Sequence, residues 1–592
     1  MSLIRPGLRK VLLQGTVSAL FLGATFVQAA QPAVTQAQST VARKDTLVIP
    51  NNVNIPAPDV WNPYIPDTFI LQGMNQNLME PLFMLNYETG QVEGWLGESF
   101  THNDAETEWT VKLRPGTEWS DGTPLTSDDV VFTIQMLQQY APQLNWSGAM
   151  KQWVQSVQAV DDRTVQFNLT GPNPRFVLEN LAGTTSQAIV PVPKHLWQGQ
   201  DPTTFKYSWN NGQGAVFSGP YVVDQFSSTE FDYKRNDNWW GAKSGAFPLP
   251  APLEIKRPWV ADNSAQAQML VNNDSDFYGP QTPSELAALQ AQNSNLKSYG
   301  DQGWTDPCPR MFTLNTTVAP WNNKDMRHAL SYAIDRQQIV NVVYEGAGLT
   351  SNFIFPTYPA MQPYIDAGKP ILDAAGVGVF DLDKSKELLQ GQGYTMGSDG
   401  KWVGSDGKTL SIDIIGPPFM EPWGRMVVQQ LQAAGVDANL RLIEWGVFRD
   451  QTGRGNFTGA VDWDGCGSTV EPWFGMNRYN KVWAQPIGTA GTEYVDNTSN
   501  AGRWSNDQYS TLMDQMGQYP IGDPRVMDLY QQALTVWADE LPDIPLVQTP
   551  TLYLFNQTYW TNWPTADNAY IQPPAHWEQF LKQLVNLKPA QQ

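Results

Sequence analysis

The stretch 461–473 (VDWDGCGSTVEPW) holds the side chains best suited to chemistry. Its acidic and aromatic members are Asp462, Trp463, Asp464, Glu471 and Trp473. Paired carboxylates beside aromatic rings are what a glycoside hydrolase uses to cleave a sugar chain. Loop acids in solvent and polar contacts to a bound ligand explain the same pattern with fewer assumptions. We therefore expect a ligand-binding loop here, with a secreted glycoside hydrolase as the less favoured alternative.

Other residues that could carry catalysis are scattered through the chain. The four histidines, His102, His195, His328 and His576, lack the spacing of metal ligands. No G-x-S-x-G nucleophile motif is present. The string Gly407-Lys408-Thr409 is similar to the end of a phosphate-binding loop, but Trp402 stands where that loop needs its first glycine. We therefore expect no enzymatic activity, no cofactor and no metal.

Length and charge limit the classes of protein that fit. A chain of 592 residues is too long for one hydrophobic core, so two or three domains are expected. Its 41% apolar and 16% charged residues are typical of a globular protein rather than a disordered one. A formal net charge of −21 offers no basic field to neutralise phosphates, which argues against a nucleic-acid partner.

The first residues have the pattern of an export signal. Basic residues precede an apolar run over 11–27, which ends in Val27-Gln28-Ala29. This predicts a signal peptide at 1–29, cleaved near Ala29, and a periplasmic or extracellular protein. No cysteine lies near the cleavage point, so we expect no lipid anchor. Residues 30–43 have the composition of a flexible leader, and no other stretch approaches the length of a membrane span.

Residues 108–137 carry the clearest structural pattern in the chain. Apolar and polar residues alternate over 109–113, which predicts a strand. Thr126 precedes Asp129 by three residues, close to the spacing of a capping box, and predicts the start of a helix that runs to Leu137.

Similar patterns recur along the rest of the chain. They predict strands over 164–169, 221–226, 311–314 and 436–445, and helices within 325–343 and over 384–389 and 423–434. Because helices and strands alternate throughout, the fold class is α/β or mixed α+β.

Several motifs, in order, resemble the family 5 extracytoplasmic solute-binding proteins of ABC importers, the dipeptide- and oligopeptide-binding type with its oligosaccharide-binding members. The matching segments are 75–82, 108–137, 218–221, 236–240, 325–339 with Asn315, 380–394 and 461–473. The resemblance implies a two-lobed periplasmic-binding-protein fold of the large three-domain cluster, with two hinge strands. The ligand would be enclosed when the lobes close. It also implies ABC permease subunits as partners, and we expect a monomer.

The resemblance also divides the chain into domains. It implies domain I from 44–88, 215–300 and 539–592, domain II from 89–214, and domain III from 301–538.

The two cysteines, Cys308 and Cys466, leave two possibilities open by arithmetic alone, a disulfide or two unrelated core residues. In oligopeptide-binding members, a cysteine seven residues before the asparagine of the domain III entry strand bonds to the cysteine of the ligand loop. Cys308 lies seven residues before Asn315, and Cys466 takes the other place. The resemblance therefore implies a Cys308–Cys466 disulfide.

The ligand loop departs from the peptide-binding pattern at one position. In peptide-binding members an aspartate two residues after the loop cysteine takes the charged amino terminus of the peptide. Here that position is Ser468. A carboxylate enclosed with an ammonium needs the cation to arrive with the ligand, whereas a hydroxyl suits a neutral partner.

Tryptophan content points in the same direction. The chain has 24 tryptophans, and Trp61, Trp146, Trp259, Trp304, Trp463 and Trp473 do not coincide with aromatic positions of the family. Flat aromatic rings stack on the apolar faces of sugars, and polar side chains bind the hydroxyls. We therefore favour a neutral oligosaccharide of the cello-, xylo- or manno- type over an oligopeptide.

The expected ligand contacts come from both lobes. Asp67 and Phe69 lie where family members contact ligand from the rim of the first lobe. The full set is Asp67, Phe69, Trp146, Trp259, Trp304, Trp463, Ser468, Glu471 and Trp473.

Overall fold

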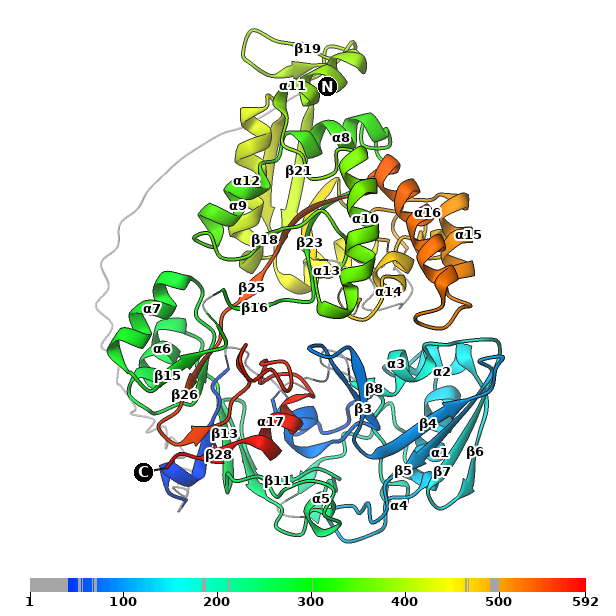
Figure 1. The fold of residues 1–592 in the computed structure, drawn as a ribbon, viewed down its shortest axis with the longest axis vertical. Coiled ribbons are helices and arrows are strands. Elements are labelled where there is room, and N and C mark those ends of the chain that lie inside the picture. The colour runs from blue at the N-terminus through cyan, green and yellow to red at the C-terminus, as the bar shows by residue number, and fades with distance from the viewer. Residues whose placement is uncertain are drawn as a thin grey trace, which may run out of the picture. The chain divides into compact units, whose positions relative to one another are not determined.

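The computed structural model describes residues 41–591 apart from 52–54, 56, 67, 69–71, 184–187, 211–212, 301, 464–465, 467 and 490–499. The predicted signal peptide, nearly all of the predicted leader, and two predicted ligand residues, Asp67 and Phe69, lie outside the described residues. Residues 43–592 form one unit in which helices and strands alternate (Figure 1), as the predicted mixed class requires.

The first sheet joins distant parts of the chain. Its order is β1 (Thr46–Val48), β13 (Glu254–Pro258), β12 (Glu230–Arg235) and β11 (Tyr221–Phe226). β1 pairs with β13 in parallel, so residues just after the leader lie beside residues 254–256. β11 coincides with the strand predicted over 221–226.

The predicted motif at 108–137 is confirmed. β5 spans Glu108–Leu113, and α1 (Ser127–Gln139) begins after Thr126, whose backbone N–H donates to Asp129 Oδ2 at 2.9 Å. The surrounding antiparallel sheet has the order β4 (Gly97–His102), β5, β7 (Thr164–Leu169) and β6 (Val154–Asp161). A three-stranded sheet has the order β3 (Gln91–Gly94), β2 (Phe83–Asn86) and β8 (Ala182–Gly183). Along the chain, β2 and β3 come before the strands of the antiparallel sheet, and β8 comes after them.

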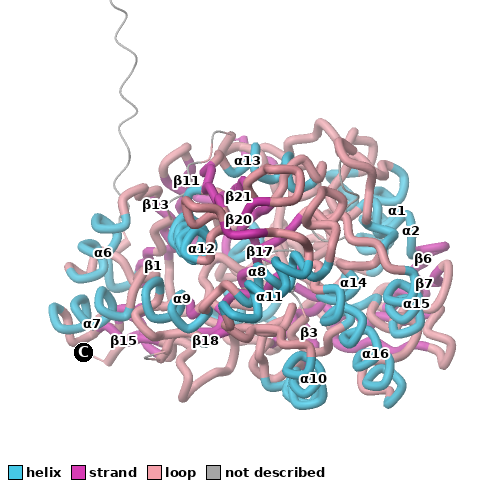
Figure 2. Tube along the Cα trace, turned by 90° about the horizontal axis from the view of Figure 1, so that it is seen from above, coloured by secondary structure: helices cyan, strands magenta, loops and turns pink. Residues whose placement is uncertain are grey.

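The largest sheet has six strands. Their order is β18 (Leu349–Thr350), β24 (Asp543–Gln548), β17 (Arg310–Leu314), β23 (Gly459–Trp463), β21 (Ser411–Gly416) and β22 (Asp437–Leu442). α12 (Glu421–Ala433) packs on β21 and β22, α9 (Arg336–Val343) packs on β24, and α11 (Leu382–Gly391) packs on α8 (Lys324–Tyr332); Figure 2 shows these helices together with β17 and β21 from above. β24 lies beyond residue 538, where the resemblance placed the end of domain III, and yet pairs in this sheet.

One predicted strand of this sheet is too long. The alternating pattern over 436–445 predicts a single strand, but β22 ends at Leu442. Glu444 accepts hydrogen bonds from the backbone N–H groups of Gly446 and Val447, and so starts α13 (Trp445–Gly453). A helix cap therefore overrides the strand pattern and releases Trp445 from the sheet.

Two short strands connect the six-stranded sheet to a smaller sheet, β14 (Phe277–Tyr278), β26 (Leu554–Asn556) and β15 (Leu296–Ser298). β16 (Trp304–Thr305) runs from β15 to β17, and β25 (Pro550–Thr551) runs from β24 to β26. β16 and β25 pair antiparallel, so the chain crosses twice along one ribbon (Figure 1). These are the two predicted hinge strands.

The remaining elements are short pairs and helices. The helices are α2 (Ser147–Trp153), α3 (Phe176–Asn180), α4 (Lys194–Trp197), α5 (Trp240–Lys243), α6 (Asn263–Val271), α7 (Pro283–Gln292), α8 (Lys324–Tyr332), α10 (Gln362–Ala374), α14 (Trp473–Asn477), α15 (Asp507–Met516), α16 (Pro524–Glu540) and α17 (Phe580–Asn586). Strand pairs are β9 (Trp209–Asn210) with β10 (Gln213–Gly214), β19 (Thr395–Met396) with β20 (Trp402–Val403), and β27 (Trp560–Thr561) with β28 (Lys588–Pro589).

A buried carboxylate organises three of the tryptophans. Glu80 accepts hydrogen bonds from the indole N–H groups of Trp95 at 2.8 Å, Trp239 at 3.2 Å and Trp240 at 2.7 Å. All four side chains are buried. A buried indole N–H costs free energy unless it is bonded, so one carboxylate stabilises three aromatic core residues.

A second buried carboxylate joins three segments that are distant in the sequence. Glu578 is fully buried, and its Oε1 accepts hydrogen bonds from Asn75 Nδ2 at 2.9 Å and from the Ala188 N–H at 2.7 Å. Burial raises the pKa of Glu578 from 4.5 to about 7, although both donors favour the charged form.

This pKa predicts a pH-dependent contribution to stability. Between pH 4.5 and about 7 the folded protein holds a proton that the unfolded chain releases, so the free energy of unfolding falls as pH rises through that window. Glu578→Gln removes the titration. We expect the free energy of unfolding of the wild type, minus that of the variant, to fall by about 3 kcal/mol across the window.

Urea denaturation at several pH values checks this expectation. The exposed Gln390→Ala on α11 changes no titratable group, so it is the control, and its difference from the wild type should not change with pH. Parallel pH profiles for the wild type and Glu578→Gln would contradict the assignment.

Candidate functional site

The candidate site lies at one edge of the six-stranded sheet. β21, β22 and β23 are parallel, so their carboxyl ends lie at the same edge. β17 is antiparallel to β23, which places Arg310, its first residue, opposite Trp463, the last residue of β23. In open sheets with parallel strands, ligands bind outside the carboxyl ends of the strands.

The hinge strands attach at this same edge. β16 leads into Arg310 at the start of β17, and β25 follows the end of β24, whose Val547 pairs with Arg310. The edge therefore faces the other lobe, which contains the sheet of β14, β26 and β15 (Figure 1). We call it the carboxyl edge.

Each of the three parallel strands delivers an aromatic side chain to the carboxyl edge. Phe419 follows β21, Trp445 follows β22 and Trp463 ends β23. The Trp445 and Trp463 rings stack with centroids 5.2 Å apart and planes 19° apart, and the Phe419 ring lies 5.8 Å from Trp463. We call these three residues the aromatic platform.

The aromatic platform is open to solvent. Phe419 is 54% exposed and Trp445 is 37% exposed, and Trp463 is partly buried. Adjacent exposed aromatic rings are unfavourable in water, and such patches mark surfaces that a ligand or partner covers. Flat rings suit the C–H faces of sugars as well as apolar side chains.

The predicted disulfide is confirmed and lies at this edge. Cys308 is bonded to Cys466, with Cα atoms 4.3 Å apart. The bond ties the residues that precede Arg310 on β17 to the loop that follows Trp463 on β23. It therefore holds the two walls of the site together covalently.

The ligand loop beyond Cys466 uses its side chains inside the protein. Ser468 is fully buried, and its Oγ accepts a hydrogen bond from the Gly475 N–H at 2.5 Å and lies 3.4 Å from the Pro472 carbonyl oxygen. Glu471 Oε2 accepts from the Trp473 N–H at 2.9 Å, and the Trp473 indole N–H donates to the Met513 carbonyl at 3.0 Å. Ligand contacts by these three residues stay predictions.

A buried ion pair joins the ligand loop to the other lobe. Arg175 precedes α3, and its Nε and Nη2 donate to the two carboxylate oxygens of Glu471 at 2.8 and 3.2 Å. The two side chains are 1% and 2% exposed. The guanidinium lies over the Trp473 ring at 4.8 Å, and Nη1 donates to the carbonyls of Gly517 and Tyr519. We call the Arg175–Glu471 pair the inter-lobe bridge.

A second carboxylate lies beside the inter-lobe bridge. Glu179 is on α3, one turn after Arg175. Burial raises its pKa to about 7; the charge of Arg175 lowers this pKa, and that of Glu471 raises it. The bridge region therefore carries two carboxylates for one guanidinium, and desolvation favours the neutral form of Glu179.

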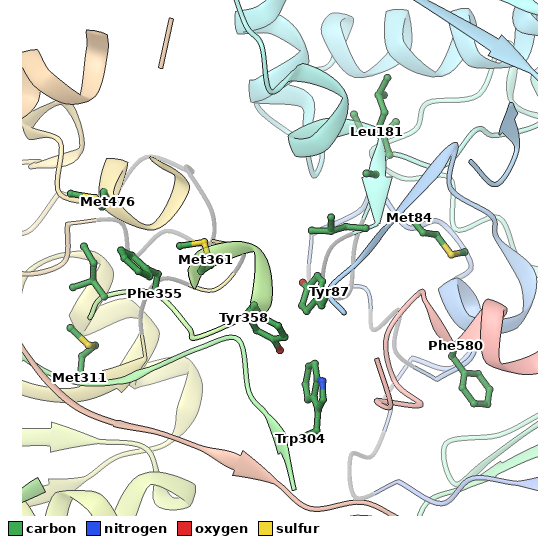
Figure 3. Close-up of a cluster of buried hydrophobic side chains, with 14 of the residues drawn as sticks. Met84, Tyr87, Leu181, Trp304, Met311, Phe355, Tyr358, Met361, Met476 and Phe580 are labelled. Atoms are coloured by element: carbon green, nitrogen blue, oxygen red, sulfur yellow. The ribbon is translucent and has the colours of Figure 1, made fainter. Parts of the chain in front are cut away.

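The other predicted tryptophans lie apart from the aromatic platform. Trp304 is 3% exposed on β16, where its indole N–H donates to Glu88 at 3.0 Å. Figure 3 shows Trp304 beside Tyr358 and Tyr87, with centroids 6.1 and 6.4 Å away. Trp304 therefore packs within the hinge.

Trp146 and Trp259 belong to the first lobe. Trp146 lies just before α2 and packs edge-on against Tyr64, with centroids 6.0 Å apart. Trp259 follows β13 and forms a parallel β-bridge with Asn51. Both side chains are partly buried. Trp463 lies in the aromatic platform, Ser468, Glu471 and Trp473 lie together in the loop that leads into α14, and Trp146, Trp259 and Trp304 lie elsewhere.

Sequence reasoning missed four residues of this region. Trp445 was overlooked because the strand pattern over 436–445 hid the end of β22, and Phe419 was overlooked because no strand was predicted over 411–416. Arg310 and Arg175 match no motif. One available signal was that an aromatic residue ends or closely follows each of the segments 411–416, 437–442 and 459–463.

Two further observations concern the described part of the chain. Among those residues, no group of three or more histidine, cysteine, aspartate or glutamate side chains could hold a metal ion. The helices described there are all too short or too polar to cross a membrane.

Comparisons with known proteins identify the family. Residues 91–484, about two thirds of the chain, match the family described as bacterial extracellular solute-binding proteins, family 5 Middle. The glutathione-binding protein GsiB of Escherichia coli K12 is 26% identical over 496 residues, which cover 82% of this chain and 86% of that protein.

Solved structures agree in fold. The periplasmic oligopeptide-binding protein of an oligopeptide ABC transporter from Thermotoga maritima superposes with a TM-score of 0.80 at 24% identity, covering 93% of this chain and all of that chain. The same protein with bound mannohexaose gives a TM-score of 0.76. The oligopeptide-binding protein AppA from Bacillus subtilis, in complex with a nonapeptide, gives 0.68 at 19% identity, covering 92% of this chain and 99% of that chain.

These matches set aside the glycoside hydrolase alternative. The two crossing strands, the carboxyl edge and the match over residues 91–484 lead to one conclusion: this chain belongs to the family 5 extracellular solute-binding proteins, which serve ABC importers and are not enzymes.

Proposed function

We propose that this protein captures a neutral oligosaccharide of the cello-, xylo- or manno- type between its lobes and delivers it to the permease of an ABC importer. The aromatic platform is the observation that carries the proposal. Its exposed rings at the carboxyl edge suit the C–H faces of successive sugar units. The predicted signal peptide would bring the chain to the compartment where such a ligand is met.

Ser468 supports a neutral ligand. The position where peptide-binding relatives carry an aspartate holds a fully buried hydroxyl, which is already bonded to the Gly475 N–H. A peptide ammonium would therefore lack that partner. The mannohexaose bound to the relative from Thermotoga maritima shows that this fold accommodates a neutral oligosaccharide. Relatives that bind glutathione or a nonapeptide keep peptide as the alternative ligand.

Isothermal titration calorimetry separates the two ligand classes. Cello-, xylo- and manno-oligosaccharides are titrated in parallel with glutathione and a mixture of tri- to pentapeptides. We expect heat of binding from at least one oligosaccharide series and none from the peptides. Tight binding of a peptide with no response to any oligosaccharide would overturn the proposal.

The aromatic platform gives a residue-level prediction. Trp445→Ala and Phe419→Ala remove stacking surface, so each should weaken oligosaccharide binding by about tenfold or more, measured as Kd by calorimetry. Phe380→Ala is the matched control, because Phe380 is 47% exposed and lies on a different part of the chain. Unchanged affinity in both platform variants would remove the platform from the site.

The inter-lobe bridge should stabilise the ligand-bound arrangement. Ligand that contacts both lobes shifts the population toward the closed state, and a buried ion pair formed only there adds to the same shift. Arg175→Met leaves the Glu471 charge buried and unpaired on closure, which is strongly unfavourable. We expect its Kd for oligosaccharide to rise at least tenfold.

A double variant tests that explanation. Arg175→Met with Glu471→Gln removes both charges of the bridge, so it should recover part of the lost affinity. Glu345→Gln is the control, since Glu345 makes an exposed inter-lobe contact to the Ser284 N–H and hydroxyl, and it should change Kd less than twofold. Wild-type affinity in Arg175→Met would show that the bridge plays no part in closure.

A further inference from the structure

Arg310 lies at the hinge end of the aromatic platform with donors to spare. It is the first residue of β17, opposite Trp463. Its Nη1 donates to the Cys308 carbonyl at 2.5 Å, and its Nη2 lies 3.6 Å from Asp306 Oδ2. Among the described residues, its buried Nε–H has no hydrogen-bond partner. A guanidinium has five N–H donors, and these two contacts engage only part of them.

Aromatic rings hold the guanidinium in place. Arg310 Cζ lies 5.3 Å from the centroid of the Trp423 ring and 5.9 Å from that of Trp463. The Trp423 indole N–H donates to the Tyr344 hydroxyl at 2.5 Å, which fixes that ring. The Cys308–Cys466 disulfide ties the two adjoining segments together. A planar donor group held in this way is pre-organised for directional hydrogen bonds.

Asp306 supplies an acceptor beside these donors. Its Oδ1 accepts from the Cys308 N–H at 2.8 Å, and its Oδ2 faces Arg310. The Asp306 side chain is 23% exposed and that of Arg310 is 12% exposed, so both can be reached. The pair has no net charge. An anionic ligand group would meet the carboxylate as well as the guanidinium, whereas neighbouring hydroxyls can accept from one and donate to the other.

We propose that Arg310 and Asp306 form the polar half of a sugar subsite that binds two adjacent hydroxyls of one unit, with Trp463 as its aromatic half. This assignment rests on the proposed oligosaccharide function. The guanidinium N–H groups donate to the oxygen of one hydroxyl, and the Asp306 carboxylate accepts the proton of the next. A subsite of this kind selects neutral units with free neighbouring hydroxyls.

Calorimetric titration of variants tests the subsite. Arg310→Lys keeps the charge but loses the planar fork, and should weaken binding of the best neutral oligosaccharide at least tenfold. Asp306→Asn should weaken it at least threefold. Arg425→Lys is the control, because Arg425 is exposed on the same helix as Trp423 and should bind as the wild type does. Melting temperatures of all variants check that folding is preserved.

A deoxy ligand separates direct contact from a structural role. An oligosaccharide that lacks one hydroxyl of the bound unit should bind the wild type more weakly than the parent sugar, and Arg310→Lys should lose most of that discrimination. Equal discrimination by both proteins, or an Arg310→Lys affinity within twofold of the wild type, would overturn the subsite. Tighter wild-type binding of a uronate-containing oligosaccharide than of its neutral counterpart would overturn the neutral assignment. Absence of any oligosaccharide binding by the wild type would instead reject the proposed function itself.

Discussion

The paired crossing strands β16 and β25 are the constraint on which the rest of the structure depends. They leave the six-stranded sheet at one edge and enter the sheet of β14, β26 and β15 as neighbours. A ribbon of this kind permits bending between the lobes and little sliding, because the two strands are hydrogen-bonded to each other. The carboxyl edge must therefore always face the same surface of the other lobe.

That geometry explains why polar and aromatic groups gather where they do. The carboxyl ends of three parallel strands and the disulfide all meet at the edge where the chain crosses. Farther from the ribbon, the inter-lobe bridge joins the ligand loop to Arg175. The hinge is stabilised by packing of Trp304, Tyr87 and Tyr358. Apolar packing thus stabilises the hinge strands, and the buried Arg175–Glu471 ion pair joins the two lobes away from the hinge.

The tryptophans divide into two physical classes. Trp95, Trp239 and Trp240 are core residues whose indole N–H groups share one buried carboxylate. Trp445 and Trp463 lie at the carboxyl edge and expose aromatic surface. The number of tryptophans therefore says less about the ligand than their position does, and position depends on where each strand ends.

Much of the fold could be predicted because it depends on local patterns. The alternation of β5 and the cap at Thr126 are set within a few residues, and family resemblance supplied the disulfide and the hinge strands. The candidate site was harder, because its residues meet only through sheet order. The sequence pattern predicted a strand that includes Trp445, but a helix cap at Glu444 ends that strand early. Arg310 became a candidate only because its guanidinium lies against Trp423 and Trp463, which are distant from it in sequence.

A crystal structure of the protein with its best-binding oligosaccharide tests the central claim most directly. The account predicts a sugar unit against the aromatic platform at Trp445 or Trp463, with hydroxyls in hydrogen-bond reach of Arg310. A sugar bound away from the carboxyl edge, or a peptide at this edge in place of the sugar, would contradict it.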